Sequence, residues 1–185
     1  MTTVFIAGSI TIKKIDDLVK DRIANILDAG HRIIVGDADG ADKAVQDHLA
    51  LDGRARVTIY CSGERPRNNS GLWPVEKIDT DAKPGTRAFF TAKDLKMAQV
   101  ADFGLMIWDS KSTGTLSNVI ELTGRGKKSL VYISKAKEFC SIGSASHIDK
   151  LVSVMSGIAR ENAESKINLS RKIEQLKNAQ SGFDF

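Results

Sequence analysis

Short apolar runs rich in β-branched residues alternate with helical patterns along the first two-thirds of the chain. These runs are expected to be strands, and they span residues 4–7, 32–35, 57–60, 103–108 and 129–133. Between them, apolar residues recur at spacings of three and four, which is typical of amphipathic helices. Strands that are apolar throughout are buried on both faces, and intervening helices favour parallel pairing with right-handed crossovers. The sequence therefore predicts an α/β fold, a Rossmann-like doubly wound sheet of five parallel strands.

The last part of the chain follows a different pattern. We expect residues 1–135 to form a Rossmann-like domain and residues 136–185 to form a C-terminal helical extension. Apolar residues of this extension, such as Ile148, Leu151 and Ile173, lie at helical spacing. We favour a capping helix followed by a more exposed one over a helical contact between two copies. A homo-oligomer is nevertheless expected, and these helices are its candidate contact.

Composition limits the classes of partner. The chain has 27 Lys and Arg against 23 Asp and Glu, a formal net charge of +4. This small excess is compatible with an anionic ligand, and no stripe of basic residues interleaved with aromatic residues is evident, so nucleic acid is not an expected partner. No apolar run reaches the ~20 residues that cross a bilayer, and no signal peptide precedes the first strand. We therefore expect a cytoplasmic protein with no membrane partner.

Three turns after predicted strands carry the candidate ligand-binding residues. The carboxyl ends of parallel strands meet at one edge of the sheet, where open α/β folds bind ligands. The first turn is Gly8-Ser9-Ile10-Thr11, in which glycine permits close backbone approach and the hydroxyls can bind a ligand. The alternative is an ordinary turn.

The second turn, Gly36-Asp37-Ala38-Asp39-Gly40-Ala41-Asp42, joins a strand to a helix. Its glycines expose amides at a positive helix end, which suits an anion. Asp37 and Asp39 would repel a phosphate unless they cap the helix, hold a cation, or accept hydrogen bonds from a ribose or a base. Helix capping by Asp39 or Asp42 is the alternative.

The third turn follows the fourth predicted strand and most resembles a phosphate cradle. Small hydroxyl residues flank a glycine directly before a helix, and Lys111 adds positive charge. Its candidate ligand-binding residues are Asp109, Ser112, Thr113, Gly114, Thr115 and Asn118. A merely capped helix is the alternative.

The order and spacing of these motifs resemble the SLOG superfamily, and most nearly its YspA-like branch. The matching stretches are Ala7-Gly8-Ser9, residues 36–42, Ala101-Asp102 and Gly114-Thr115, within residues 3–133. The resemblance implies a Rossmann-like module that binds a nucleotide or nucleotide-derived ligand, as a sensor or a sequestering protein. It implies neither a cofactor nor a metal.

The chain is also similar to nucleoside 2-deoxyribosyltransferases and deoxynucleotide N-glycosidases. Asp94 matches an aspartate of those families on the helix before the fourth strand, and Ser112 matches their loop serine. Their catalytic glutamate lies four residues after the loop glycine, where this chain has Asn118, and an amide cannot attack an anomeric carbon. Glu121, one helical turn further, or Asp94 would be the catalytic carboxylate if the protein is an enzyme.

Three function classes follow. The leading hypothesis is a nucleotide-binding module, and the alternative is a hydrolase or transferase acting on N-glycosidic bonds of nucleosides or nucleotides. A third is an accessory protein for nucleic-acid processing, related to DNA-processing protein A, which predicts oligonucleotide binding that weakens steeply with salt. A long loop, residues 62–85, contains Arg65 and Arg67 near its start and is followed by Arg87, and these arginines could clamp a phosphate. The loop also contains Trp73, a candidate to cover a base.

Overall fold

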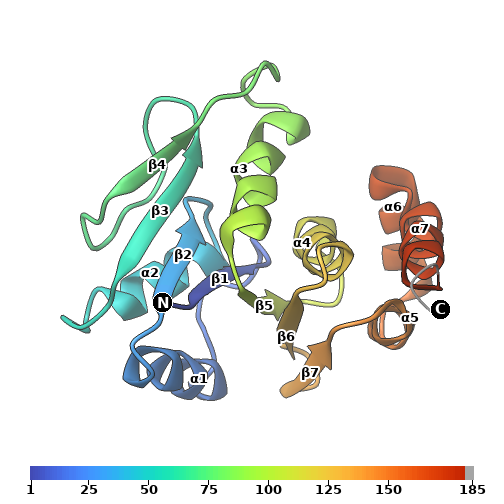
Figure 1. The fold of residues 1–185 in the computed structure, drawn as a ribbon, viewed down its shortest axis with the longest axis horizontal. Helices are drawn as coiled ribbons and strands as arrows, with labels where there is room; N and C mark the ends of the chain where they lie inside the picture. The colour runs from blue at the N-terminus through green and yellow to red at the C-terminus, as the bar shows by residue number, and fades with distance from the viewer. Residues whose placement is uncertain (182–185) are drawn as a thin grey trace.

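The computed structural model describes residues 1–181, which form one mixed sheet flanked by helices (Figure 1). The strands are β1 (Thr3–Gly8), β2 (Arg32–Gly36), β3 (Val57–Ser62), β4 (Val75–Ile78), β5 (Phe103–Trp108), β6 (Lys128–Ile133) and β7 (Glu138–Ile142). The helices are α1 (Asp17–Asp28), α2 (Ala41–Leu49), α3 (Arg87–Val100), α4 (Thr113–Gly124), α5 (Ala145–Ser153), α6 (Gly157–Ile167) and α7 (Leu169–Ser181).

The sheet has the order β4-β3-β2-β1-β5-β6-β7, and every neighbouring pair is parallel except β6 with β7. The chain moves outward from β1 to β4 and then returns to the other side of β1, so the strand order reverses between β1 and β5. Apolar residues of α1 and α2 pack on one face of the sheet, and those of α3 and α4 pack on the other. The doubly wound, Rossmann-like α/β fold is therefore confirmed, and the loops after β1 and β5 diverge at the topological switch point.

The sheet has seven strands where five were expected. β4 lies inside the long loop of residues 62–85, and β7 lies in the range assigned to the helical extension. Both are edge strands with largely exposed or half-exposed side chains, so neither has the continuous apolar run that marked the buried strands. Edge strands of this kind are recognised by their pairing, which the local sequence does not encode.

The three C-terminal helices stack at one end of the molecule beside α4 (Figure 1). Their apolar residues, including Ile148, Leu151, Ile167 and Ile173, belong to the same buried cluster as the inner face of α4. The helices approach closely, because a Cβ on Gly124 of α4 would lie 3.1 Å from Leu176 of α7. These apolar positions are thus covered within the chain itself. Within residues 1–181, no helix combines the length and the apolar character needed to traverse a lipid bilayer.

Candidate functional site

The turns after β1 and β5 are joined by side-chain hydrogen bonds. Thr11 Oγ1 donates to Asp109 Oδ2 at 2.7 Å, and the Asp109 amide donates to Ser9 Oγ at 3.1 Å. Asp109 also accepts the backbone N–H groups of Lys111 and Ser112, at 2.9 and 2.7 Å. Burial acts to raise the pKa of the Asp109 carboxyl, but these hydrogen bonds outweigh it and hold that pKa below its ordinary value. Asp109 is therefore an ionised organiser of the two turns.

The turns after β1 and β2 are held together by backbone packing. The Ala41 amide donates to the Ser9 carbonyl at 3.2 Å, and the Gly8 amide donates to Asp42 Oδ1 at 3.2 Å. A Cβ on Gly8 would lie 2.5 Å from the Ala41 Cβ. Gly40 has φ = 80°, and a Cβ there would overlap the backbone of Ile10, whose own side chain is exposed. Gly8 and Gly40 therefore allow one turn to pack closely against another. The sequence predicted instead that glycine would let the backbone approach a ligand.

The start of α4 is mostly filled with its own side chains. Ser9, Thr113, Thr115 and Asn118 are all buried, and Ser9 Oγ lies 3.4 Å from Thr115 Oγ1. Ser112 caps the helix by accepting from the Thr115 amide. Gly114 borders open space, because its nearest neighbour would be 4.0 Å from an added Cβ. An anion could therefore meet the end of this helix from outside, but the enclosed cradle that was expected is occupied by side chains.

Lys93 on α3 is buried beneath the β2 turn. Its ammonium lies 2.7 Å from Asp94 Oδ1 and 4.0 Å from Asp37 Oδ1. A Cβ on Gly36 would lie 2.6 Å from the Lys93 Nζ and 2.5 Å from Asp42 Oδ2, so glycine at this position makes room for the charge cluster. Burial disfavours the charge on Lys93, but attraction to Asp94, Asp42 and Asp37 outweighs it and raises the Lys93 pKa.

Asp42 is the titratable member of this cluster. Burial raises its pKa to about 6, with repulsion from Asp94 and Asp37 adding to the effect, while Lys93 and the Gly8 amide oppose it. Sequence reasoning missed Lys93. Its signal was its position four residues before the apolar Met97, on the side of the helix that faces the sheet. A lysine buried there requires carboxylate partners.

Asp37 and Asp39 hold the segment that follows β3. Arg67 donates from Nη2 to Asp37 Oδ1 at 2.8 Å and from Nε to Asp37 Oδ2 at 3.0 Å. Asn68 Nδ2 donates to Asp39 Oδ1 at 3.0 Å and to the Asp37 carbonyl at 2.9 Å. Burial acts to raise the pKa of Asp37, but the Arg67 hydrogen bonds outweigh it and lower that pKa. Within residues 1–181, no cluster of His, Cys, Asp and Glu could hold a metal ion.

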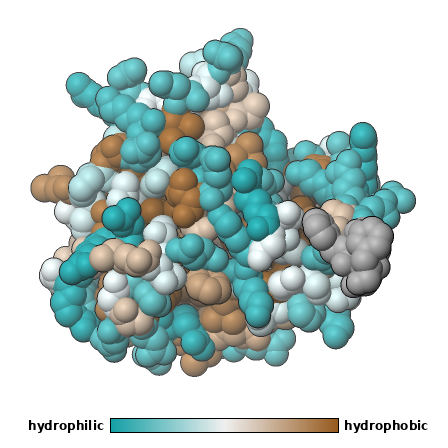
Figure 2. Space-filling view, in the orientation of Figure 1, coloured by the Kyte–Doolittle hydropathy of each residue, from teal (hydrophilic) through white to brown (hydrophobic). Residues whose placement is uncertain are grey.

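Aromatic and basic side chains lie together at the start of α3. The Arg67 guanidinium lies 4.5 Å from the ring centroid of Phe90, which packs edge-on against Phe89 at 5.3 Å. Arg87 donates to Thr113 Oγ1 at 3.0 Å and so links α3 to the start of α4. Both phenylalanines are partly exposed, and Figure 2 shows hydrophobic surface, in brown, on the face that carries β3, β4 and α3. The fold thus brings together basic and aromatic residues that are separate in sequence.

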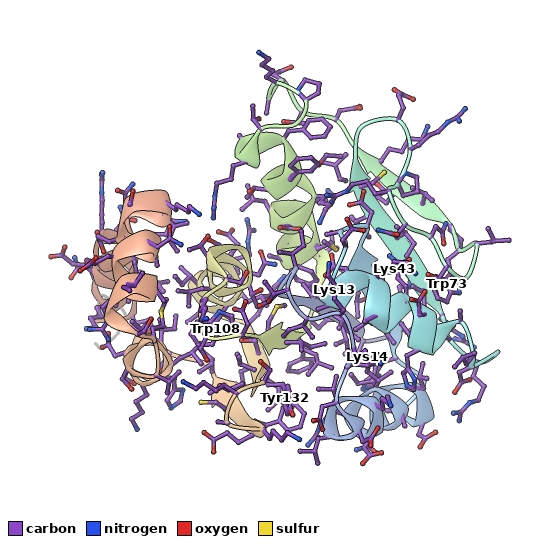
Figure 3. The ribbon with its side chains drawn as sticks, turned by 180° about the vertical axis from the view of Figure 1, so that it is seen from behind. Lys13, Lys14, Lys43, Trp73, Trp108 and Tyr132 are labelled. Atoms are coloured by element: carbon purple, nitrogen blue, oxygen red, sulfur yellow. The ribbon has the colours of Figure 1, made fainter. Side chains whose placement is uncertain are left out.

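Further basic side chains extend along the same edge. Lys13 and Lys14 lie in the loop after β1 (Figure 3), Lys111 follows β5, and Arg65 follows β3. All four residues are exposed. Within the part of the chain that the structure describes, none of them makes an ion pair. Their charges are available to an anion.

The two candidate catalytic carboxylates lie in different places, Asp94 in the charge cluster beneath the β2 turn and Glu121 further along α4. Glu121 pairs with Arg125 at 2.7 Å and faces a groove between α4 and α7, whose lining includes Lys172. It lies eight residues into α4, about 12 Å along the helix axis from Thr113. Asp94 is engaged by Lys93. Glu121 therefore lies about one helical turn further from the sheet edge than Asn118 does.

Comparisons with known proteins give one informative finding. No protein-family model matches the chain, and no curated protein matches it either. A solved structure of DNA processing protein A from Helicobacter pylori, described for a unique single-stranded DNA binding mode, matches with a TM-score of 0.56 and 19% identity. The match covers 96% of this chain and 81% of that one. This likeness shows a shared fold.

The likeness also corrects two expectations. One was that the chain binds a small nucleotide-type ligand or, as the alternative, acts on N-glycosidic bonds; the other was that nucleic acid is not a partner. A protein that shares this fold binds single-stranded DNA, so the fold gives no reason to prefer a small nucleotide. The filled cradle and the displaced Glu121 agree with this correction.

Proposed function

We propose that this chain binds single-stranded DNA along the sheet edge where β1, β2, β3 and β5 end. The observation that carries the proposal is the constellation of Arg67, Phe89, Phe90 and Arg87 at the start of α3. Aromatic rings stack on any base, and nearby guanidinium groups neutralise phosphates, so this combination suits a strand with unpaired bases. The single-stranded DNA binding described for the structure with the same fold supports the same assignment.

Each part of the edge has a role in this proposal. Phe89 and Phe90 provide the surface on which a base stacks. Lys13, Lys14, Lys111 and Arg65 contact successive phosphates, and the open end of α4 at Gly114 adds the favourable field of a helix N-terminus. No pocket that encloses a whole nucleotide is needed, because backbone contacts and stacking are sequence-tolerant.

The motifs at residues 36–42 and Ala101-Asp102 support placing the chain in the YspA-like branch of the SLOG superfamily. In this proposal the glycine-containing turns hold the sheet edge in shape, and their glycines do not contact the DNA themselves. Asp37, Asp42 and Asp109 anchor neighbouring segments, and the exposed lysines and arginines make the contacts.

Fluorescence anisotropy with labelled dT20 tests the proposal. For about four phosphate contacts to a single strand, affinity falls about 50-fold between 50 and 200 mM salt. Replacing Lys13, Lys14 and Lys111 together with alanine lowers both the affinity and this salt dependence. The matched control replaces Lys150, Lys166 and Arg171, three exposed basic residues of the C-terminal helices, and leaves both unchanged. Equal losses in the two triple variants, or no binding by the parent protein, would overturn the proposal.

A further inference from the structure

A groove of about 490 Å³ opens at the amino edge of the sheet, where β2, β3 and β4 begin. Its lining includes two arginines, Arg32 and Arg56. The apolar residues of the lining include Ala55, Val57, Trp73 and Pro74. These strands are parallel and carry the proposed DNA-binding loops at their carboxyl ends, so the groove lies at the opposite edge. DNA binding at the carboxyl edge therefore leaves it unexplained.

The two arginines of the groove are neighbours. Ile33 pairs with Val57 in the register of β2 and β3, and the Ile33 amide donates to the Arg56 carbonyl at 2.9 Å. Arg32 and Arg56 each precede this pair by one residue, so they lie side by side. Both are exposed, and neither makes an ion pair within residues 1–181. Adjacent like charges repel each other, so an anionic ligand would relieve this pair.

A third arginine of the region is neutralised within the chain. Arg54 donates to Asp28 Oδ1 at 2.8 Å and to both carboxylate oxygens of Asp52, at 3.1 and 2.8 Å. The Arg56 guanidinium has only a weak acceptor, the Met1 sulfur at 4.0 Å. The fold thus supplies carboxylates to Arg54 and leaves the two guanidinium groups of the groove available.

Trp73, which is labelled in Figure 3, forms a fixed wall of the groove. Its amide donates to Asn69 Oδ1 at 2.9 Å, and Asn69 Nδ2 donates to the Trp73 carbonyl at 2.8 Å. A Cβ on Gly71 would overlap the indole ring, so glycine at this position lets the loop close against the side chain. Trp73 also packs against the buried apolar cluster on this side of the sheet. A wall held in this way loses little conformational entropy when a ligand binds.

We propose that this groove binds an acidic peptide segment of a partner protein. Carboxylates of the peptide pair with Arg32 and Arg56, because a guanidinium group matches a carboxylate at two points. An apolar or aromatic side chain of the peptide packs against Trp73. Tryptophan and arginine are also the residues that most often dominate the binding energy of protein interfaces. This inference goes beyond the proposed function and does not depend on it.

A DNA strand is the less suitable occupant of this groove. The outer strand β4 runs from the groove to the proposed DNA-binding edge and carries the exposed Glu76. The basic residue of β4, Lys77, is paired with Glu64 at 3.4 Å. A phosphate backbone that joined the two edges along β4 would therefore meet repulsion and no free cation on that strand.

Fluorescence anisotropy with two labelled peptides tests the proposal. The acidic probe is Gly-Asp-Asp-Phe-Asp-Asp-Gly, and its matched partner has asparagine in place of every aspartate. We expect the parent protein to bind the acidic peptide about tenfold more tightly. Replacing Arg32 and Arg56 together with glutamine should bring the two affinities within twofold. The control replaces Lys150 and Lys166, which removes the same charge from exposed positions of the C-terminal helices and should keep the preference.

Tryptophan emission locates the bound peptide. The chain has two tryptophans, and Trp108 is only 1% exposed. The acidic peptide should change the emission of the parent protein. In Trp73→Phe, which keeps an aromatic wall, this change should disappear while the peptide still binds. An emission change that survives Trp73→Phe would place the peptide elsewhere and overturn the proposal.

The remaining outcomes separate the occupants. Equal binding of the two peptides by the parent protein, or a preference that survives the loss of both arginines, would overturn the peptide site. Displacement of the acidic peptide by saturating dT20 would show that the two compete and would also overturn it, whereas a peptide that stays bound supports it. Failure of the protein to bind dT20 would overturn the DNA-binding proposal alone.

Discussion

At the scale of single residues, one buried charge cluster fixes the shape of the proposed binding edge. Lys93 is surrounded by three carboxylates, and Gly36 is the residue that leaves room for it. Removing the lysine would leave Asp37, Asp42 and Asp94 to repel one another in a buried setting. Removing one partner of a buried ion pair strongly destabilises the folded state, because it leaves a buried charge without compensation. The intact cluster itself adds little to the free energy of unfolding. We therefore assign Lys93 to holding the β2 turn against α3.

Asp42 makes the stability of this cluster depend on pH. Its folded pKa of about 6 lies above the unfolded value of 3.8, so the folded state binds the proton more tightly. Its contribution to stability is fully present below pH 3.8 and is lost as the pH rises through 6. Between pH 7 and pH 5 the free energy of unfolding should rise by about 1 kcal/mol more in the parent protein than in Asp42→Asn. Denaturant unfolding at both pH values measures this difference.

The contributions of the other titrating groups cancel when the parent protein is compared with the asparagine variant. Lys93, Asp94, Asp37 and the Gly8 amide face Asp42, and they are present in both proteins. His48, whose pKa is lowered mainly by burial, also contributes equally to both. If the free energy of unfolding of Asp42→Asn changes with pH as much as that of the parent protein, the raised pKa of Asp42 is wrong.

At the scale of secondary-structure elements, the core elements were predictable from sequence and the edges were not. The buried strands have continuous apolar runs, because both of their faces are covered; they are β1, β2, β3, β5 and β6. These runs are visible in the sequence, so the five strands could be predicted from it. β4 and β7 are half-exposed edge strands, so their sequences resemble loops. The contact between Arg67 and Phe90 at the start of α3 was not predicted for a related reason, because it is a tertiary contact that no local spacing reveals.

The start of α3 provides the prediction at this scale. Phe90→Ala removes the proposed stacking surface and the ring beneath Arg67. Stacking of a base on an aromatic side chain is worth about 1–3 kcal/mol, so affinity for dT20 should fall about tenfold or more. Anisotropy titrations check this result, and circular dichroism confirms that the fold is kept.

The matched control for this variant is Phe103→Ala. Phe103 is 49% exposed and begins β5, so it lies at the opposite edge of the sheet from Phe90. We expect its removal to leave affinity within twofold of the parent. An equal loss in both phenylalanine variants would show that α3 carries no special contact.

At the scale of the whole molecule, the topology decides where a ligand can bind. The reversal of strand order between β1 and β5 separates α1 from α4. Because these strands are parallel, the basic loops after β1, β3 and β5 all lie at one edge. Sequence patterns placed the turns after β1, β2 and β5 at this edge, and side-chain and backbone hydrogen bonds join them there. They could not predict that the turns pack against one another through Gly8 and Gly40. That packing closes the expected cradle and leaves an open edge in its place.

Hydrogen exchange of the backbone amides, with and without dT12, tests this account most directly. Saturation with the strand should slow exchange in residues 9–14, 63–69 and 109–114, the loops that form the proposed edge, while α5, α6 and α7 remain unchanged. Slowed exchange confined to α5–α7, or none in these three loops at full occupancy, would contradict the account.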